Sequence, residues 1–259
     1  RGDFVLNSTG TWCVIMKPSG SARFDDEDIG KVVFYNLDAF SRPVKTAIFC
    51  GGMEFDAYLA LFKRIAGSEG SSDFDPAVYG RILRERRLFI LPEVFPGTGQ
   101  FTGSRARIVE DGAVIPFEAV QKGETVPRFF RDPAVARPVL IISLALQTEV
   151  AMRRAGMRAG EPLYVEGGFR RNESYNALLA ALAPGSRVSL TSMKEATAFG
   201  TAITAKVAKE GLEPSQVAGL FDIDLSPVAL RDLPGLDAYR EGFARRVAAG
   251  RRRRRRAGR

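Results

Sequence analysis

One stretch joins an apolar strand, a pair of glycines and a helix start: Tyr164-Val165-Glu166-Gly167-Gly168-Phe169-Arg170-Arg171-Asn172. Paired glycines at the C-terminal end of a strand allow positive φ angles and a close approach of a ligand to the backbone. The free N–H groups of the helix that Asn172 opens point into the same space. The stretch is therefore typical of a nucleotide-binding turn, although a tight turn without a ligand uses the same residues.

The first half of the chain is predicted to be rich in strands. Strands are expected over 4–7, 11–17 and 31–37, with turns at Gly10 and 18–20, and these three form an antiparallel meander. A strand over 46–50 ends at Gly51-Gly52, and Phe55, Tyr58 and Phe62 give the next segment, 54–66, the period of a helix. Further elements follow: a helix over 76–86, a strand over 88–91, an irregular loop over 92–105 and a hairpin over 107–117 that turns at Asp111-Gly112.

From Asp132 onward the pattern alternates between helices and strands. Helices are predicted over 132–155, 172–182 and 194–210, and strands over 163–166 and 187–191. Residues 213–234 look irregular, and 236–248 predict a terminal helix. Antiparallel strands followed by helix, strand, helix, strand and helix match an α/β fold of the ribonuclease H-like (actin-like ATPase) class, a mixed sheet with helices on both faces.

The positive charge of the chain is concentrated at its C-terminus. The calculated pI is 9.8, but residues 251–259 contain seven arginines, which leaves 31 Lys and Arg against 30 Asp and Glu elsewhere. We therefore expect a folded domain over 1–250 and a disordered arginine-rich tail over 251–259. No structured basic face with aromatic residues accompanies the tail, so no specific nucleic-acid partner is predicted.

The absence of histidine excludes several kinds of chemistry. Ser-His-Asp and Cys-His hydrolase mechanisms are ruled out. Two cysteines without histidine do not form a usual zinc site, and Cys13 and Cys50 in apolar surroundings fit a reduced cytoplasm. No apolar run is expected to reach the length of a membrane span, and the N-terminus lacks a signal-peptide pattern.

A second glycine-containing turn is predicted at Ser8-Thr9-Gly10-Thr11-Trp12. Gly10 lets a hairpin bend close to an anion, and the backbone N–H and hydroxyl of Thr11 are suitable donors to phosphate oxygens. Ser8 and Thr9 can assist. The alternative is a β-turn that satisfies only its own backbone.

Taken together, three motifs resemble those of the FGGY carbohydrate kinases, in particular rhamnulokinase-like members. The Ser8–Trp12 stretch resembles the Ser-Gly-Thr-Trp turn that begins their C-terminal domain, and 167–172 resembles their Gly-Gly-x-x-x-Asn adenosine loop. Residues 195–202, Glu-Ala-Thr-Ala-Phe-Gly-Thr-Ala, are similar to their final helix. The resemblance covers roughly residues 4–210, and the Gly51-Gly52 pair and the 91–103 loop look like weaker landmarks.

The resemblance implies ATP-dependent phosphorylation of a sugar hydroxyl, ketose or deoxyketose, with Mg²⁺ accompanying ATP. Ser8, Thr9, Gly10 and Thr11 are then the phosphate-binding residues. Gly167, Gly168, Phe169 and Asn172 are the adenosine-binding residues: Gly168 leaves room for ribose or phosphate beside the Phe169 backbone, and Asn172 contacts the adenine edge or the sugar. Asn172 is equally a good helix N-cap, worth about 1 kcal/mol.

The same resemblance implies that this chain is only the C-terminal, nucleotide-binding half. In the family the general base is an aspartate in a Gly-x-His-Asp-Thr-like motif upstream of the first turn, and the N-terminal domain makes most sugar contacts. Only six residues precede Asn7, and Asp3 is too near the turn to replace that base. We therefore expect no catalytic residue and no metal ligand in the chain, and an isolated chain that is inactive.

Two alternatives remain open from the sequence. One is a non-catalytic nucleotide-binding module derived from the same fold. The other is a basic protein that associates with RNA or a membrane through the arginine run at 251–256.

Overall fold

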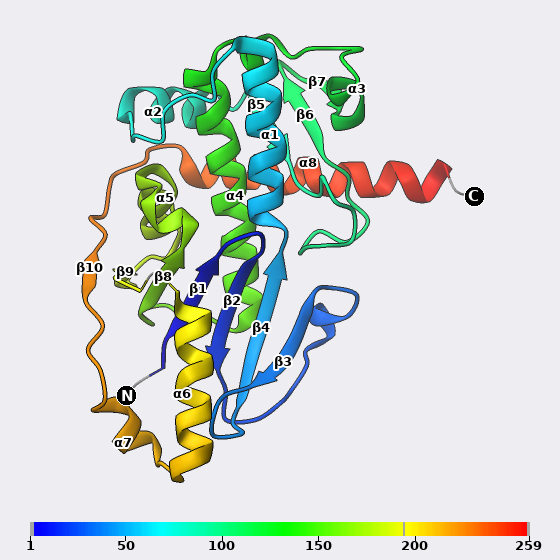
Figure 1. Cartoon of the computed structure of the whole chain (residues 1–259). Helices are drawn as coiled ribbons and strands as arrows, with labels where there is room; N and C mark the ends of the chain where they lie inside the picture. Colours follow the sequence, from blue (N-terminus) through cyan, green and yellow to red (C-terminus); the bar gives the residue numbers. More distant parts are fainter. Residues whose placement is uncertain (1–2, 194, 258–259) are drawn as a thin grey trace.

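The structure, a computed structural model, describes residues 3–193 and 195–257, with the backbone alone over 251–257. A seven-stranded sheet at its centre has the order β10-β9-β8-β1-β2-β4-β3 (Figure 1). The strands are β1 (Val5–Thr9), β2 (Cys13–Pro18), β3 (Val33–Leu37), β4 (Pro43–Phe49), β8 (Leu163–Gly167), β9 (Val188–Thr191) and β10 (Leu225–Pro227). A separate antiparallel sheet contains β5 (Leu88–Leu91), β6 (Arg107–Glu110) and β7 (Ala113–Pro116).

The large sheet is mixed. β1 runs parallel to β8, and β8 runs parallel to β9, whereas the β1–β2, β2–β4 and β3–β4 pairs are antiparallel. The expected meander of the first three strands is wrong, because β4 lies between β2 and β3. The physical reason is burial: β4 has Thr46, Ala47 and Phe49 inside the protein, whereas β3 is half-buried or exposed throughout and occupies the edge.

Helices lie on both faces of the sheet, as expected for the ribonuclease H-like class. Helix α4 contacts β2, β4, α1 and α5 on one face, and Figure 1 shows α6 in front of the sheet with α4 behind it. The helices are α1 (Gly51–Ala66), α2 (Pro76–Glu85), α3 (Phe117–Gln121), α4 (Pro133–Ala155), α5 (Glu173–Leu182), α6 (Ala196–Glu210), α7 (Pro214–Ala218) and α8 (Leu236–Ala257). Three 3-10 turns add η1 (Asp26–Asp28), η2 (Arg128–Arg131) and η3 (Gly168–Arg171).

Helix α4 is the central helix of the core. The Asp132 side chain caps its start by accepting from the N–H of Ala134 at 3.1 Å, and Gly156 ends it with φ 89°. The helix has the length of a membrane span and a mean hydropathy of 1.4, so the expectation that no run reaches this length is wrong. Because 83% of its apolar window is buried inside the protein, we assign α4 to the core.

The C-terminal region differs from the prediction in two ways. Residues 213–234, expected to be irregular, include α7 and β10, which are too short to leave a periodic signal. Helix α8 continues to Ala257, although the sequence predicted a helix ending at Ala248 and a disordered tail from 251. Arginine is a good helix former, and the packed part of α8 supplies the nucleus from which the helix extends. The predicted tail residues Gly258 and Arg259 lie outside the described residues.

Candidate nucleotide-binding site

The two predicted turns are neighbours in space. β1 and β8 are parallel and adjacent, and Thr9 is in register with Gly167. The N–H of Phe169 donates to Thr9 Oγ1 at 3.0 Å, and Thr9 Oγ1 donates to the carbonyl of Glu166. Two motifs that are far apart in the sequence therefore meet at the carboxyl ends of parallel strands, the edge at which α/β sheets bind ligands.

The two glycines of the second turn have different roles. Gly167 has φ 80° and ψ −156°, and a Cβ there would lie 2.0 Å from the carbonyl oxygen of Thr9. Only glycine fits this position. A Cβ on Gly168 would meet only that same oxygen at 3.7 Å, and one on Gly10 would meet nothing within 4 Å. Gly168 and Gly10 therefore face open space, which a ligand can enter.

The residues of the first turn divide into a supporting and an accessible group. Thr9 is buried and its hydroxyl is engaged with the second turn, and Ser8 is half-buried on the opposite face of the sheet. Gly10, Thr11 and Trp12 are exposed, and the N–H of Gly10 donates to the Trp12 carbonyl at 2.9 Å. The Thr11 hydroxyl is thus the accessible side-chain donor of this turn. Trp12, the single tryptophan of the chain, is 36% exposed beside it.

Phe169 and Asn172 are both engaged in the fold. The ring of Phe169 packs edge-on against Phe55 and Tyr175, at centroid distances of 5.2 and 5.0 Å. Its N–H is already bonded to Thr9. Asn172 caps α5, because its Oδ1 accepts from the N–H of Tyr175 at 2.9 Å. Because Asn172 Oδ1 is engaged in the cap, a nucleotide contact of this side chain would use its Nδ2 group.

The start of α1 is a part of the site for which the sequence predicted no role. The helix begins at Gly51, earlier than the expected Glu54, and the N–H of Met53 donates to the Thr11 carbonyl at 3.2 Å. A Cβ on Gly52 would lie 2.0 Å from the carbonyl oxygen of Gly10. The Gly51-Gly52 pair, visible in the sequence, is therefore needed for close packing of α1 against the first turn.

The carboxylate near the N-terminus of the chain, Asp3, does not reach this edge. Asp3 precedes β1 and pairs with Arg158 at 3.8 Å, at the end of the strand away from the turn. At about 3.3 Å per residue it lies roughly 20 Å from Gly10. Asp3 is therefore too far from the turn to act there, and not too near as the sequence suggested. Within residues 3–193 and 195–257, no three Cys, Asp or Glu side chains gather as a metal site.

A family comparison identifies the chain. The family described as "Carbohydrate kinase FGGY, C-terminal domain" matches residues 1–214. The chain belongs to the FGGY carbohydrate kinase family. The resemblance seen in its sequence is thereby confirmed, while the rhamnulokinase-like subtype stays a prediction. Comparison with curated proteins gives no match.

Solved structures show the same fold for this FGGY-family chain. A carbohydrate kinase from Novosphingobium aromaticivorans matches with 23% identity and a TM-score of 0.65, covering 96% of this chain and 46% of that one. A ligand-bound xylulose kinase from Lactobacillus acidophilus has 12% identity and a TM-score of 0.62, with 93% and 45% covered. Glycerol kinase from Plasmodium falciparum with ADP has 13% identity and a TM-score of 0.56, with 95% and 47% covered. The chain thus spans less than half the length of these kinases.

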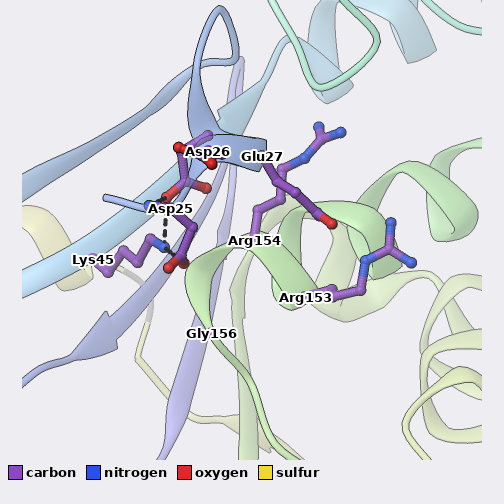
Figure 2. Close-up of a pocket in the computed structure, with 8 residues that line it drawn as sticks. Asp25, Asp26, Glu27, Lys45, Arg153, Arg154 and Gly156 are labelled. Atoms are coloured by element: carbon purple, nitrogen blue, oxygen red, sulfur yellow. Dashed lines mark hydrogen bonds and ion pairs between the residues drawn. The ribbon is translucent and has the colours of Figure 1, made fainter. Parts of the chain in front are cut away.

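Two cavities of the FGGY-family chain lie away from the turns. The first has a volume of about 280 Å³ and is lined by η1, Lys45 of β4 and the end of α4. Lys45 pairs with Asp28 at 2.7 Å and with Asp25 at 3.1 Å, and Figure 2 shows Lys45 beside Asp25. These ion pairs fix η1 on β4. The second, of about 640 Å³, lies between the end of α5 and residues 228–237. Neither cavity is lined by a residue of the two glycine turns.

Proposed function

We propose that the chain is the nucleotide-binding half of an enzyme that transfers phosphate from ATP to a sugar hydroxyl. The observation that carries this proposal is the register of Thr9 with Gly167, which puts both glycine turns at one sheet edge. Membership of the FGGY carbohydrate kinase family supports the reaction class. The sugar is proposed to be a ketose or deoxyketose, and the compartment the cytoplasm.

The turns supply different contacts to ATP. The backbone N–H and the hydroxyl of the exposed Thr11 are proposed to donate to phosphate oxygens, where charge grows during phosphoryl transfer, and Gly10 leaves room for the phosphate beside them. Gly168 leaves the space for the ribose and α-phosphate, and Asn172 Nδ2 contacts the adenosine. The second turn is held against β1 by the close approach of Gly167 to the Thr9 carbonyl and by the hydrogen bond from the Phe169 N–H to Thr9 Oγ1. Ser8, in β1, is proposed to support the first turn.

Magnesium is proposed to bind mainly through ATP. Mg²⁺ prefers phosphate oxygens and water with few protein carboxylates, and its charge offsets that of the transferred phosphate. This chain's own residues would then orient the phosphates and leave the metal its waters.

The proton-accepting base and most sugar contacts are proposed to come from the half of the enzyme that this chain does not cover. That assignment is supported by the 45–47% share of each kinase that the chain matches. General-base help contributes about 10²–10⁴-fold to such reactions, and loss of substrate positioning adds to it. The isolated chain is accordingly proposed to bind nucleotide without measurable turnover.

A phosphotransfer assay tests the function. Residues 1–259 are mixed with the separately expressed N-terminal half, or fused to it, and Mg-ATP is supplied with a panel of ketoses, deoxyketoses and glycerol. We expect ADP release that depends on one sugar and on both halves. Turnover by highly purified residues 1–259 alone would contradict the assignment of the base to the other half of the enzyme. If a folded, ATP-binding fusion phosphorylated no sugar, the non-catalytic module would be favoured.

A further inference from the structure

Two buried carboxylates that the nucleotide contacts do not use lie behind the first turn. Glu54, in the first turn of α1, is 4% exposed, and Glu93, two residues after β5, is 2% exposed. Glu93 also has φ 77°, a left-handed conformation that non-glycine residues rarely adopt. Burying two carboxylates side by side is costly, and a strained backbone adds to that cost. Their hydrogen bonds show what offsets it.

Glu54 joins three segments. Its Oε1 accepts from the N–H groups of Glu93 and Val94 at 2.7 and 2.9 Å, and its Oε2 accepts from Gln147 Nε2 of α4 at 3.0 Å. Burial is the main cause that raises the pKa of Glu54 to about 7, and the neighbouring Glu93 raises it further. The side chain therefore connects α1 to α4 and to the start of the 93–101 loop.

Glu93 closes that loop on itself. Its Oε2 accepts from the N–H of Gly97 at 2.7 Å, and its Oε1 accepts from the N–H of Phe101 at 3.0 Å. One carboxylate thus satisfies two backbone donors of a segment that has no regular structure. A Cβ on Gly99 would lie 3.1 Å from both Glu93 Oε1 and Phe49 Cβ, so the closed loop is pressed against the end of β4.

The outer end of the loop is anchored to the sheet. Gln100 Nε2 donates to the carbonyls of Ile48 and Val32 at 2.8 and 3.0 Å. Arg154 of α4 donates from Nη1 to Gln100 Oε1 at 2.8 Å. The loop is therefore held at both ends, by Glu54 on one side and by the β4–α4 region on the other.

The same helix turn that carries Glu54 touches the candidate phosphate site. Met53 donates its N–H to the Thr11 carbonyl, and Gly52 packs on the Gly10 carbonyl. Glu54 directly follows these two residues. A continuous series of contacts runs from the 93–101 loop through Glu54 and the α1 start to Gly10-Thr11.

We propose that Glu54 and Glu93 are positioning residues for the nucleotide phosphates: they fix the 93–101 loop against the start of α1, and α1 in turn fixes the Gly10-Thr11 turn. This role rests on the proposed function. Whether Glu54 makes the Gly10-Thr11 turn rigid is a property of the nucleotide-free protein, so it is measured separately from nucleotide binding.

The first test uses the nucleotide-free protein and its single tryptophan, Trp12, which adjoins Thr11. Glu54→Ala removes the contacts to 93 and 94, so we expect a changed Trp12 emission and stronger iodide quenching. Hydrogen exchange of the Glu93 and Val94 amides should accelerate at least about tenfold, as expected when a protecting bond is lost, and the Gly97 and Phe101 amides, which donate to Glu93, should exchange faster because the loop loses its anchor on α1. Glu54→Gln keeps a side-chain oxygen that accepts from the two backbone N–H groups. If the Gln147 amide flips, its oxygen can accept from the new side-chain amide nitrogen at position 54. This variant should restore both signals.

Glu161→Gln is the matched control. Glu161 is also a buried carboxylate, 8% exposed, but it pairs with Lys17 at 2.5 Å at the far end of β2. Its replacement should lower stability without changing Trp12 emission or exchange in the loop. Fast exchange of the four loop amides in the wild-type protein, or unchanged Trp12 signals in folded Glu54→Ala, would overturn the inference.

The second test adds Mg-ATP. We expect Glu54→Ala to bind it about tenfold or more weakly, since small misplacements of binding groups are costly, while Glu54→Gln and Glu161→Gln stay near wild-type affinity. Equal affinity for Glu54→Ala and wild type overturns the positioning role alone. Absence of binding by the folded wild-type protein overturns the proposed function and this role with it, while the Trp12 result still decides whether Glu54 makes the turn rigid.

Discussion

Gly167 and Gly168 are adjacent, yet the fold requires glycine only at the first. Gly167 has φ 80°, and a Cβ there would lie 2.0 Å from a backbone oxygen, whereas a Cβ on Gly168 would lie at an ordinary contact distance of 3.7 Å. We predict that Gly167→Ala lowers the free energy of unfolding by more than about 2 kcal/mol, because strained backbone costs about 1–3 kcal/mol and the clash adds to it. Gly168→Ala should change it by less than about 1 kcal/mol. Urea unfolding of both variants measures the difference, and equal losses would contradict it.

Glu54 gives stability a distinctive pH dependence. Its pKa is raised from 4.5 to about 7 in the folded protein, so the folded state binds the proton more tightly than the unfolded chain. The stabilising contribution is fully present below about pH 4.5 and is lost as the pH rises through 7. Between pH 5 and 8 we predict that the wild-type protein loses on the order of 3 kcal/mol relative to Glu54→Gln. Parallel stability curves for the two proteins would show that Glu54 titrates normally.

At the scale of residues, the sequence predicted which side chains gather but not how each is engaged. Both glycine turns and the N-cap at Asn172 were readable from local patterns. Thr9 was assigned to phosphate, and the structure shows its hydroxyl bonded to the second turn. That bond depends on the register of β1 with β8, which no local pattern specifies. Glu93 was missed because a buried carboxylate that closes an irregular loop has no sequence period.

At the scale of elements, the first part of helix α8 is packed against the core. Tyr239, Phe243 and Val247 are buried, and Tyr239 stacks on Phe89 at 4.4 Å. We predict that Tyr239→Ala lowers the free energy of unfolding by about 3–5 kcal/mol, as for other large aromatic truncations. Deleting residues 251–259 should leave stability and ATP affinity within error. Thermal and urea unfolding test both variants, and a marked loss of ATP affinity on deletion would give the arginine run a role in the site.

The order of elements was predicted well, and their arrangement less well. Antiparallel strands followed by alternating helices and strands after Asp132 indicated a mixed sheet with helices on both faces, and the structure confirms this class. The place of β4 between β2 and β3 was not predicted, because three neighbouring antiparallel strands of similar composition permit more than one order. The early start of α1 was missed, since Gly51 and Gly52 are poor helix formers that are retained for close packing.

At the scale of the molecule, the chain corresponds to less than half the length of the solved kinases that it resembles. The structural matches cover 93–96% of this chain but only 45–47% of each of the three solved kinases compared above. Its described residues assemble both glycine turns, the α1 start and the 93–101 loop at or behind one edge of the sheet. Nucleotide binding is therefore the property that this chain should retain by itself.

Calorimetric titration of Mg-ATP into residues 1–259 tests this central claim most directly, with Gly168→Val as the site variant and Gly20→Val as its control. A Cβ on Gly20 would meet nothing within 4 Å, one on Gly168 would meet only a backbone oxygen at 3.7 Å, and Gly20 lies in the loop after β2. We predict that the wild-type protein and Gly20→Val bind with equal affinity, and that Gly168→Val, folded by circular dichroism, binds at least about tenfold more weakly, a loss of about 1.4 kcal/mol. Equal affinity in all three proteins would contradict a nucleotide site at the paired turns.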